Sequence, residues 1–174
     1  MRPLVLIGFM GSGKSTYGRA LSGKCGCPFI DTDDTIEERA GKRIADIFAD
    51  EGEEAFRNME SALIRELAEK QDEEAVISCG GGLPVREENR KLLKKAGVCV
   101  YLRAGEEFLL RRLENDRDER PMISAGDLKE RIHSLLSARE ELYLEAADFV
   151  LELEDIPEEK VISSLERIWR EINS

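Results

Sequence analysis

The sequence contains few of the residues on which histidine, zinc or disulfide chemistry depends. His133 is the only histidine among 174 residues, so catalysis by histidine is given little weight. Four cysteines are present, but Cys25 and Cys27 lie too close together for ordinary zinc spacing, and no second pair completes a site. We therefore expect four reduced, structural thiols.

Long apolar runs and an excess of positive charge are also missing. No apolar stretch approaches the length needed to cross a bilayer, and Met1 and Arg2 lead almost directly into a strand-like run without the cleavage site of a signal peptide. The formal net charge of −11 disfavours a nucleic-acid backbone as the main partner. We expect a cytoplasmic globular enzyme that binds neither membranes nor nucleic acid.

Short apolar runs alternate with helical patterns along the chain, which is typical of a parallel sheet covered by helices. Two charged segments, 32–51 and 114–126, interrupt this alternation. The second has few apolar residues to bury, so we expect it to be mobile. We expect one domain over residues 1–174. Strands are expected at 4–7, 28–31, 75–79, 98–102 and 149–153, and helices at 14–23, 53–69, 87–95 and 106–113, with two more that begin near 127 and 157.

A glycine-rich loop follows the first apolar run and leads into the first expected helix. Residues 8–16 read GFMGSGKST, which contains the G-x-x-x-x-G-K-S pattern in the strand, loop and helix context that a phosphate-binding loop requires. Its backbone amides can surround a phosphate at a helix N-terminus that favours anions. Lys14 can reach the β- and γ-phosphates of ATP, and the Ser15 hydroxyl can ligate Mg²⁺. The predicted nucleotide site comprises Gly11, Ser12, Gly13, Lys14, Ser15 and Thr16.

Acidic residues stand where the second strand is expected to end, which is the edge at which open parallel sheets bind ligands. In extended chain, Asp31 and Asp33 would point the same way. One could hold Mg²⁺ through water while the other accepts a hydrogen bond from a substrate hydroxyl. The alternative is that Asp33 or Asp34 merely caps the next helix.

Three glycines, Gly80, Gly81 and Gly82, follow the third strand. That strand ends at Ser78 and Cys79 without the acid of a Walker B pattern, which shifts the metal role toward Asp31 and a water bound by Ser78. The glycines leave room for a substrate against bare backbone and offer amide donors. A plain glycine-rich turn is the alternative.

Two arginines lie on or beside the apolar stripes of their helices. Arg139 follows Ile132 by seven residues on such a stripe, where a guanidinium needs an anion. Arg57 precedes Glu60 by one turn, so Glu60 can orient it. Directed at one cleft, the pair would form a bidentate clamp for a carboxylate; a structural salt bridge is the alternative for Arg139. Arg120, in the charged segment, is either a lid arginine that stabilises the transferring phosphoryl group or a solvated charge.

These motifs resemble those of the shikimate kinase family over nearly the whole chain. The resemblance implies a three-layer α/β P-loop NTPase fold with a five-stranded parallel sheet, a substrate-binding helical excursion over about 32–60 and a mobile lid over about 114–126. It also implies Mg²⁺-dependent transfer of the γ-phosphoryl group of ATP to the 3-hydroxyl of shikimate, in aromatic amino-acid biosynthesis. Besides the loop, it rests on Asp31-Thr32-Asp33, Ile47-Phe48, Gly52-Glu53-Glu54-Ala55-Phe56-Arg57, Gly80-Gly81-Gly82, Arg120-Pro121 and Arg139.

The same resemblance assigns roles to individual residues. Arg112 resembles the family's arginine beside the adenine, and Arg120 would reach the phosphates from the lid. Ser15 and Asp31 are the expected metal residues, and a monomer is expected. Catalysis is expected from Lys14, Asp33 and Arg120, and shikimate binding from Asp33, Arg57, Gly80, Gly81, Gly82 and Arg139.

Two other classes of protein also fit the phosphate loop. A gluconate or nucleotide kinase of the same build would share it, although paired arginines favour an acid over a nucleobase. A regulatory module that binds nucleotide without phosphorylating a metabolite is the second alternative, although Asp33, Arg57 and Arg139 argue against it.

Overall fold

The central sheet confirms the predicted α/β architecture. The structure is a computed structural model that describes residues 1–115 and 127–174. Its five strands run parallel in the order β2-β3-β1-β4-β5. The order reverses beside β1, so a crevice is expected where the chain leaves this strand. The strands are β1 (Leu4–Ile7), β2 (Phe29–Asp31), β3 (Val76–Ser78), β4 (Val98–Arg103) and β5 (Phe149–Glu152).

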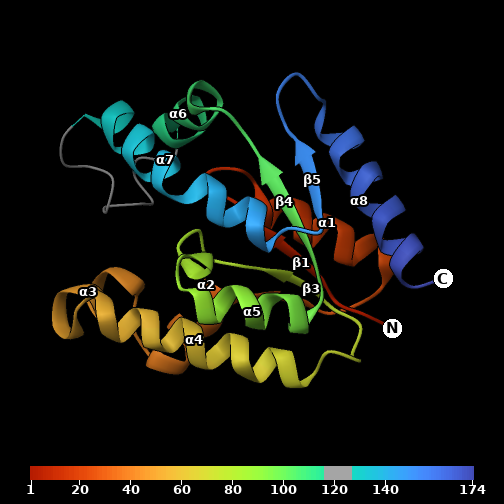
Figure 1. The fold of residues 1–174 in the computed structure, drawn as a ribbon, viewed down its shortest axis with the longest axis horizontal. Helices are drawn as coiled ribbons and strands as arrows, with labels where there is room; N and C mark the ends of the chain where they lie inside the picture. Colours follow the sequence, from red (N-terminus) through yellow and green to blue (C-terminus); the bar gives the residue numbers. More distant parts are fainter. Residues whose placement is uncertain (116–126) are drawn as a thin grey trace.

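Helices cover both faces of the sheet (Figure 1). Helices α1 and α8 pack together on one face, while α5 and α7 contact each other and β4 on the other. Helix α4 packs outside α5, alongside α3. The helices are α1 (Lys14–Cys25), α2 (Thr32–Ala40), α3 (Ile44–Glu51), α4 (Glu53–Glu69), α5 (Glu87–Ala96), α6 (Glu106–Asn115), α7 (Leu128–Ala146) and α8 (Glu158–Ile172), with a 3₁₀ turn, η1 (Leu83–Val85).

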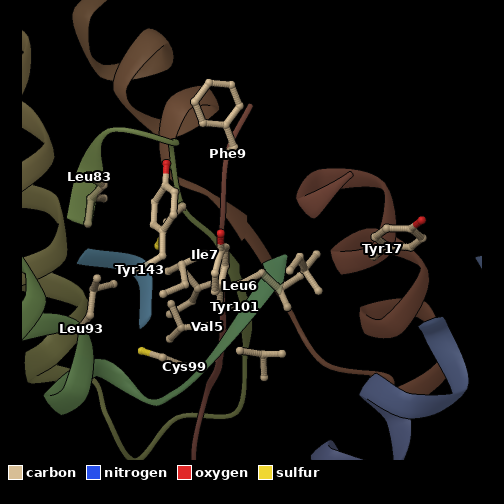
Figure 2. Packing of buried hydrophobic residues seen from close by; sticks show 14 of the residues in the cluster. Val5, Leu6, Ile7, Phe9, Tyr17, Leu83, Leu93, Cys99, Tyr101 and Tyr143 are labelled. Atoms are coloured by element: carbon tan, nitrogen blue, oxygen red, sulfur yellow. The ribbon is translucent and has the colours of Figure 1, made fainter. Parts of the chain in front are cut away.

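The core lies on both sides of the central strands, as their nearly continuous apolar sequence predicts. All four residues of β1 are fully buried, and β3 is buried along its whole length. Figure 2 shows Tyr17 on the α1 side of the sheet, away from Leu83, Leu93 and Tyr143 on the opposite side. The centres of the Tyr101 and Tyr143 rings lie 5.1 Å apart. This packing fixes α7 against β4 and positions the side chains of α7 near the glycine triplet.

The charged segment after β2 forms two helices that its weak periodicity did not predict. Asp31 caps α2, because its side chain accepts hydrogen bonds from the amides of Asp33 and Asp34. Gly41 ends α2 with a φ of 66°, a conformation that glycine adopts without strain. Gly52 then separates α3 from α4 with a φ of 87°. The cap at Asp31 and the glycine turns therefore mark the bounds of these helices, while Ile47 of α3 is fully buried in the core.

The predicted lid, about 114–126, lies almost entirely outside the described residues. Helix α6 ends at Asn115, and α7 begins at Leu128, after Asp127 has capped it by accepting from the amide of Lys129. Arg120 falls in the part of the chain that is not described, so its predicted role stays a prediction. Among the helices of residues 1–115 and 127–174, none is long and apolar enough to span a membrane.

Candidate active site

A cleft of about 650 Å³ opens at the carboxyl ends of β1, β2 and β3. It brings together the predicted phosphate loop, the acids after β2, the glycine triplet and both clamp arginines. Ser12 does not line it, because its side chain is fully buried within the loop. The candidate residues that line the cleft are Gly11, Gly13, Lys14, Ser15, Thr16, Asp31, Asp33, Arg57, Gly80, Gly81, Gly82, Arg112 and Arg139.

The phosphate loop holds Lys14 at its centre. The Lys14 ammonium group is buried and donates to the backbone oxygens of Gly8, at 2.8 Å, and Phe9, at 2.9 Å. Gly13 precedes α1 with a φ of 89°, and a Cβ there would come within 2.7 Å of the Tyr17 ring. Only glycine fits this position. The loop therefore aims a fixed positive charge and the N-terminus of α1 at the cleft.

Oxygen atoms from three elements meet beside the loop. The Ser15 hydroxyl donates to Asp31 Oδ2 at 2.5 Å and lies 3.3 Å from the Ser78 hydroxyl. Hydroxyl and carboxylate oxygens are the hard ligands that Mg²⁺ prefers. No three His, Cys, Asp or Glu side chains gather to hold a metal within the described ranges. The donor set therefore suits an ion that keeps water and substrate oxygens as ligands.

Asp33 does not stand in extended chain, contrary to the sequence-based assumption. Helix α2 begins at Thr32, so Asp33 lies in its first turn and Asp31 is the residue that caps the helix. Asp34, the other candidate cap, instead pairs with Arg19 at 2.9 Å on the surface. Asp33 Oδ1 nevertheless lies 2.5 Å from where a Cβ on Gly80 would be. The first turn of α2, not strand alternation, directs Asp33 at the cleft.

The glycine triplet is held by side chains from two other elements. The Gly80 amide donates to the Thr32 hydroxyl at 2.9 Å, and the Tyr143 hydroxyl donates to the Gly81 oxygen at 2.6 Å. A Cβ on Gly82 would come within 2.6 Å of Arg57 Nη2. Larger residues would therefore collide with the cleft side chains. Burial raises the pKa of Tyr143 to about 12, so its hydroxyl stays protonated and donates.

The structure places the two clamp arginines on one cleft, although they come from α4 and α7. Arg57 Nη1 donates to Glu60 Oε2 at 2.7 Å, and Arg57 Nη2 lies 3.4 Å from Glu53 Oε1. Arg139 is half-buried, and its Nη1 is buried without a hydrogen-bond partner in the described part of the chain. Both guanidinium groups act electrostatically on Glu60. Both cations thus lie near the same carboxyl group while they line the cleft.

Glu60 carries an unusual carboxyl group. It is 1% exposed, and burial raises its pKa from 4.5 to about 7, although Arg57 pulls in the opposite direction. The folded protein therefore binds this proton more tightly than the unfolded chain does. The resulting contribution to stability is complete below pH 4.5 and is lost as the pH rises through 7.

Glu60→Gln is expected to gain stability relative to the natural protein between pH 5 and pH 8. The change in relative free energy of unfolding should be about 2 kcal/mol, since glutamine carries no charge to desolvate. Urea denaturation at both pH values measures it. Glu66→Gln, on the same helix, is the control: Arg39 lowers the pKa of Glu66 from 4.5, so the contribution of Glu66 is already complete at pH 5 and its removal should leave the profile between pH 5 and pH 8 parallel to that of the natural protein. Parallel pH profiles for Glu60→Gln and the natural protein would contradict this account.

Arg112 lies beside the phosphate loop, next to Gly13 and Tyr17. Its Nη2 donates to the Tyr17 hydroxyl at 3.2 Å, and its guanidinium carbon lies 4.8 Å from the centre of the Phe108 ring. A Cβ on Gly13 would meet Arg112 Nη1 at 2.9 Å. A planar cation in this place can stack on a nucleobase.

Sequence reasoning missed two residues that shape the cleft. Tyr143 lies on the apolar stripe of its helix, and its hydroxyl donates to the Gly81 oxygen. A buried tyrosine usually finds a polar partner, which is the signal that could have indicated this. Thr32 was not given a role, and its fully buried hydroxyl accepts from Gly80.

Comparisons with known proteins agree with this geometry. Residues 10–169 match the family model described as shikimate kinase. A shikimate kinase of Pelotomaculum thermopropionicum is 48% identical over 82% of this chain and 81% of its own length. A structure of shikimate kinase from Acinetobacter baumannii in complex with shikimate superposes with a TM-score of 0.89 and 32% identity, covering 98% and 94% of the two chains. A gluconokinase from Sinorhizobium meliloti shares the fold, with a TM-score of 0.62 and 22% identity over 99% and 95%.

Proposed function

The chain belongs to the shikimate kinase family, and from this premise we propose how its cleft transfers the γ-phosphoryl group of ATP to the 3-hydroxyl of shikimate. The products are shikimate 3-phosphate and ADP, and the reaction belongs to aromatic amino-acid biosynthesis through chorismate. The observation that carries the proposal is the convergence of Arg57 and Arg139 on a cleft that also contains Lys14. One end of the cleft suits phosphates, and the other suits an acid.

The phosphate loop binds ATP through residues 11–16. Its backbone amides surround the β-phosphate, and Lys14 moves from its loop carbonyls onto the β- and γ-phosphates. Arg112 lies beside the adenine. Because phosphoryl transfer asks little covalent chemistry of the protein, fixed positive charge that stabilises the transition state provides most of the acceleration.

Shikimate is held at its carboxylate and at its ring hydroxyls. Arg57 and Arg139 donate to the carboxylate, and Gly80, Gly81 and Gly82 line the cleft beside the ring. The amides of Gly81 and Gly82 are the donors that the triplet offers, because the Gly80 amide donates to Thr32. Asp33 accepts the proton of the reacting 3-hydroxyl. Its position next to Gly80 supports this role, since the glycine allows the substrate to approach the carboxylate.

Mg²⁺ fits the oxygen atoms that meet beside the loop. Ser15 and Asp31 would hold it, with Ser78 within reach of the same shell. When bound, Mg²⁺ neutralises phosphate charge and orients the γ-phosphoryl group. Arg120 adds a further charge from the lid over residues 114–126, as proposed from the sequence.

We also propose that the enzyme acts as a single domain and as a monomer in the cytoplasm. All the candidate residues that the structure describes, except Ser12, line one cleft. The net charge of −11 opposes binding to nucleic acid.

A coupled assay of ADP release is expected to show turnover with shikimate and none above background with gluconate or AMP. The reason is that only shikimate presents both a ring hydroxyl to Asp33 and a carboxylate to the two arginines. Chelation of Mg²⁺ by EDTA should abolish turnover, and added Mg²⁺ should restore it. Turnover confined to gluconate or AMP would overturn the substrate assignment, while nucleotide binding without any turnover would favour a regulatory module.

A further inference from the structure

The turn that follows the glycine triplet is held by side chains of the helix after it. Asn89 Nδ2 donates to the Leu83 oxygen at 2.9 Å. Arg90 Nη1 donates to the oxygens of Pro84, at 2.9 Å, and Val85, at 2.8 Å. Both side chains are buried. These hydrogen bonds hold the backbone of η1 against α5. The glycine triplet, which directly precedes η1, is therefore anchored at its carboxyl end.

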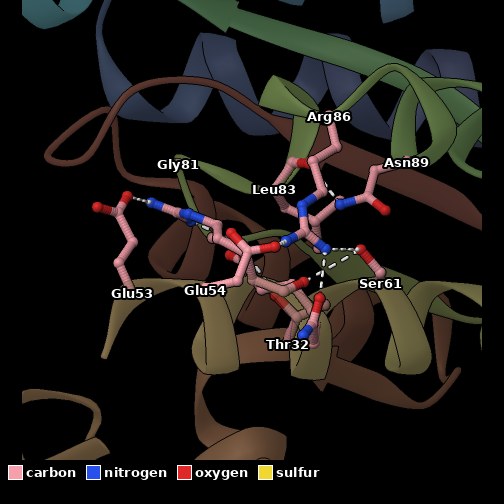
Figure 3. A network of polar contacts seen from close by, with 12 residues as sticks. Thr32, Glu53, Glu54, Ser61, Gly81, Leu83, Arg86 and Asn89 are labelled. Atoms are coloured by element: carbon pink, nitrogen blue, oxygen red, sulfur yellow. Dashed lines mark hydrogen bonds and ion pairs between the residues drawn. The ribbon is translucent and has the colours of Figure 1, made fainter. Parts of the chain in front are cut away.

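Arg86 connects the same turn to α4. Its Nη1 donates to Asn58 Oδ1 at 2.9 Å and to the Ser61 hydroxyl at 3.2 Å, and its Nη2 donates to Glu54 Oε1 at 2.7 Å. Figure 3 shows Arg86 reaching toward Glu54 and Ser61. The Ser61 hydroxyl in turn donates to the backbone oxygen of Arg57 at 3.1 Å. The Arg86 guanidinium thus contacts α4 both before and after Arg57, the residue proposed to bind the substrate carboxylate.

Arg90 connects the turn to α7. Its Nε lies 3.2 Å from Glu145 Oε1, two residues beyond Tyr143, whose hydroxyl donates to Gly81. Helix α7 is the element that carries Arg139. The two helices that supply the carboxylate clamp therefore both contact this turn: α4 through the hydrogen bonds of Arg86, and α7 through the ion pair of Arg90 with Glu145, in which Arg90 Nε forms no hydrogen bond with the described residues.

We propose that Arg86 and Arg90 are positioning residues that set the spacing between Arg57 and Arg139. The proposal rests on the proposed function, since it explains how the distance between the two arginines that bind the shikimate carboxylate is maintained. A bidentate arginine–carboxylate pair depends strongly on geometry, and a displacement of about 1 Å lowers its contribution sharply. Neither residue lines the cleft, so each acts through the helix that it holds.

Arg86→Ala is expected to raise the KM for shikimate about tenfold, with the KM for ATP changed by less than about twofold. Initial rates with each substrate varied in turn measure both constants. Arg86→Lys keeps the charge facing Glu54 but cannot reach all three acceptors, so a rise of about threefold is expected. The lysine variant also provides the test if the alanine variant fails to fold. An unchanged KM for shikimate in the folded variants would overturn the proposal.

Arg65→Ala is the matched control. Arg65 pairs with Glu88, which joins the same two helices, α4 and α5, but both side chains are 55% exposed and neither lies at the glycine turn. Loss of this pair should leave the KM for shikimate unchanged. An equal rise in both variants would mean that general packing of α4 on α5, and not the position of Arg86, governs the clamp.

A double-mutant cycle tests whether Arg86 acts through Arg57. If it does, Arg57→Ala with Arg86→Ala should bind shikimate no worse than Arg57→Ala alone, because the clamp that Arg86 positions is already lost. Additive effects would contradict this. The two proposals can fail separately. If the natural enzyme does not turn over shikimate, the proposed function is wrong. A natural enzyme that depends on Arg57 but not on Arg86 ends only the positioning role.

Discussion

Replacing Lys14 by alanine is expected to lower kcat by about 10³-fold or more without unfolding the protein. The Lys14 ammonium group is buried and already aimed at the phosphate site by two loop carbonyls, so its charge needs no rearrangement from solvent. Alanine removes the charge that meets the γ-phosphate as it transfers. Helix propensity favours alanine at this first position of α1, so the fold should persist.

Steady-state rates and circular dichroism of the variant measure the two parts of this prediction. Lys24→Ala, near the end of the same helix, provides the control, because Lys24 is 52% exposed and pairs with Glu166 at the surface. It should keep full activity. Retention of activity in Lys14→Ala would contradict the assignment of the loop as the phosphate site.

Replacing Arg139 by alanine is expected to raise the KM for shikimate about 100-fold, with little change in the KM for ATP. Arg139 also interacts with Tyr143, but its Nη1 is buried and has no hydrogen-bond partner among the described residues, so this nitrogen can donate to a ligand. Truncation leaves the substrate carboxylate facing Arg57 alone in a partly desolvated cleft, and an unpaired charge there costs about 2–3 kcal/mol.

Arg139→Lys separates charge from geometry, because lysine keeps the charge but cannot donate in a bidentate manner. We expect it to recover part of the lost affinity. Lys129→Ala is the control on the same helix, as Lys129 lies outside the cleft on an exposed position. Binding of shikimate is followed by quenching of fluorescence or by calorimetry. Equal affinity in the natural protein and Arg139→Ala would remove the basis for the clamp.

The fold could be predicted from the sequence because its signals are local. The strand before Gly8, the loop, and the helix that begins at Lys14 follow from apolar runs and a glycine pattern within a few residues. The excursion was less predictable, since α2 and α3 depend on the cap at Asp31 and on the turns at Gly41 and Gly52. The sequence therefore suggested extended chain at Asp33, whereas Asp33 lies in the first turn of α2.

The composition of the candidate site was predictable, but its energetics were not. The positions of Arg57 and Arg139 on their helices indicated a shared anion, because periodicity reports which face is inward. The raised pKa of Glu60 depends on burial that only the packed helices produce. The contacts of Arg86 with α4 and of Arg90 with α7 join residues far apart in sequence. No local pattern encodes such long-range contacts.

Asp31 occupies a position with consequences for both halves of the cleft. One of its carboxylate oxygens anchors the start of α2, and the other accepts from Ser15 at the phosphate loop. A ligand that breaks the hydrogen bond from Ser15 to Asp31 should change the strength of the hydrogen bond from the start of α2 to Asp31. In the same way, a ligand that shifts α2 should change the hydrogen bond between Asp31 and Ser15. Linkage requires any such influence to be mutual. The occupancy of the nucleotide pocket and that of the acceptor pocket should therefore be thermodynamically cooperative, with one aspartate as the shared element.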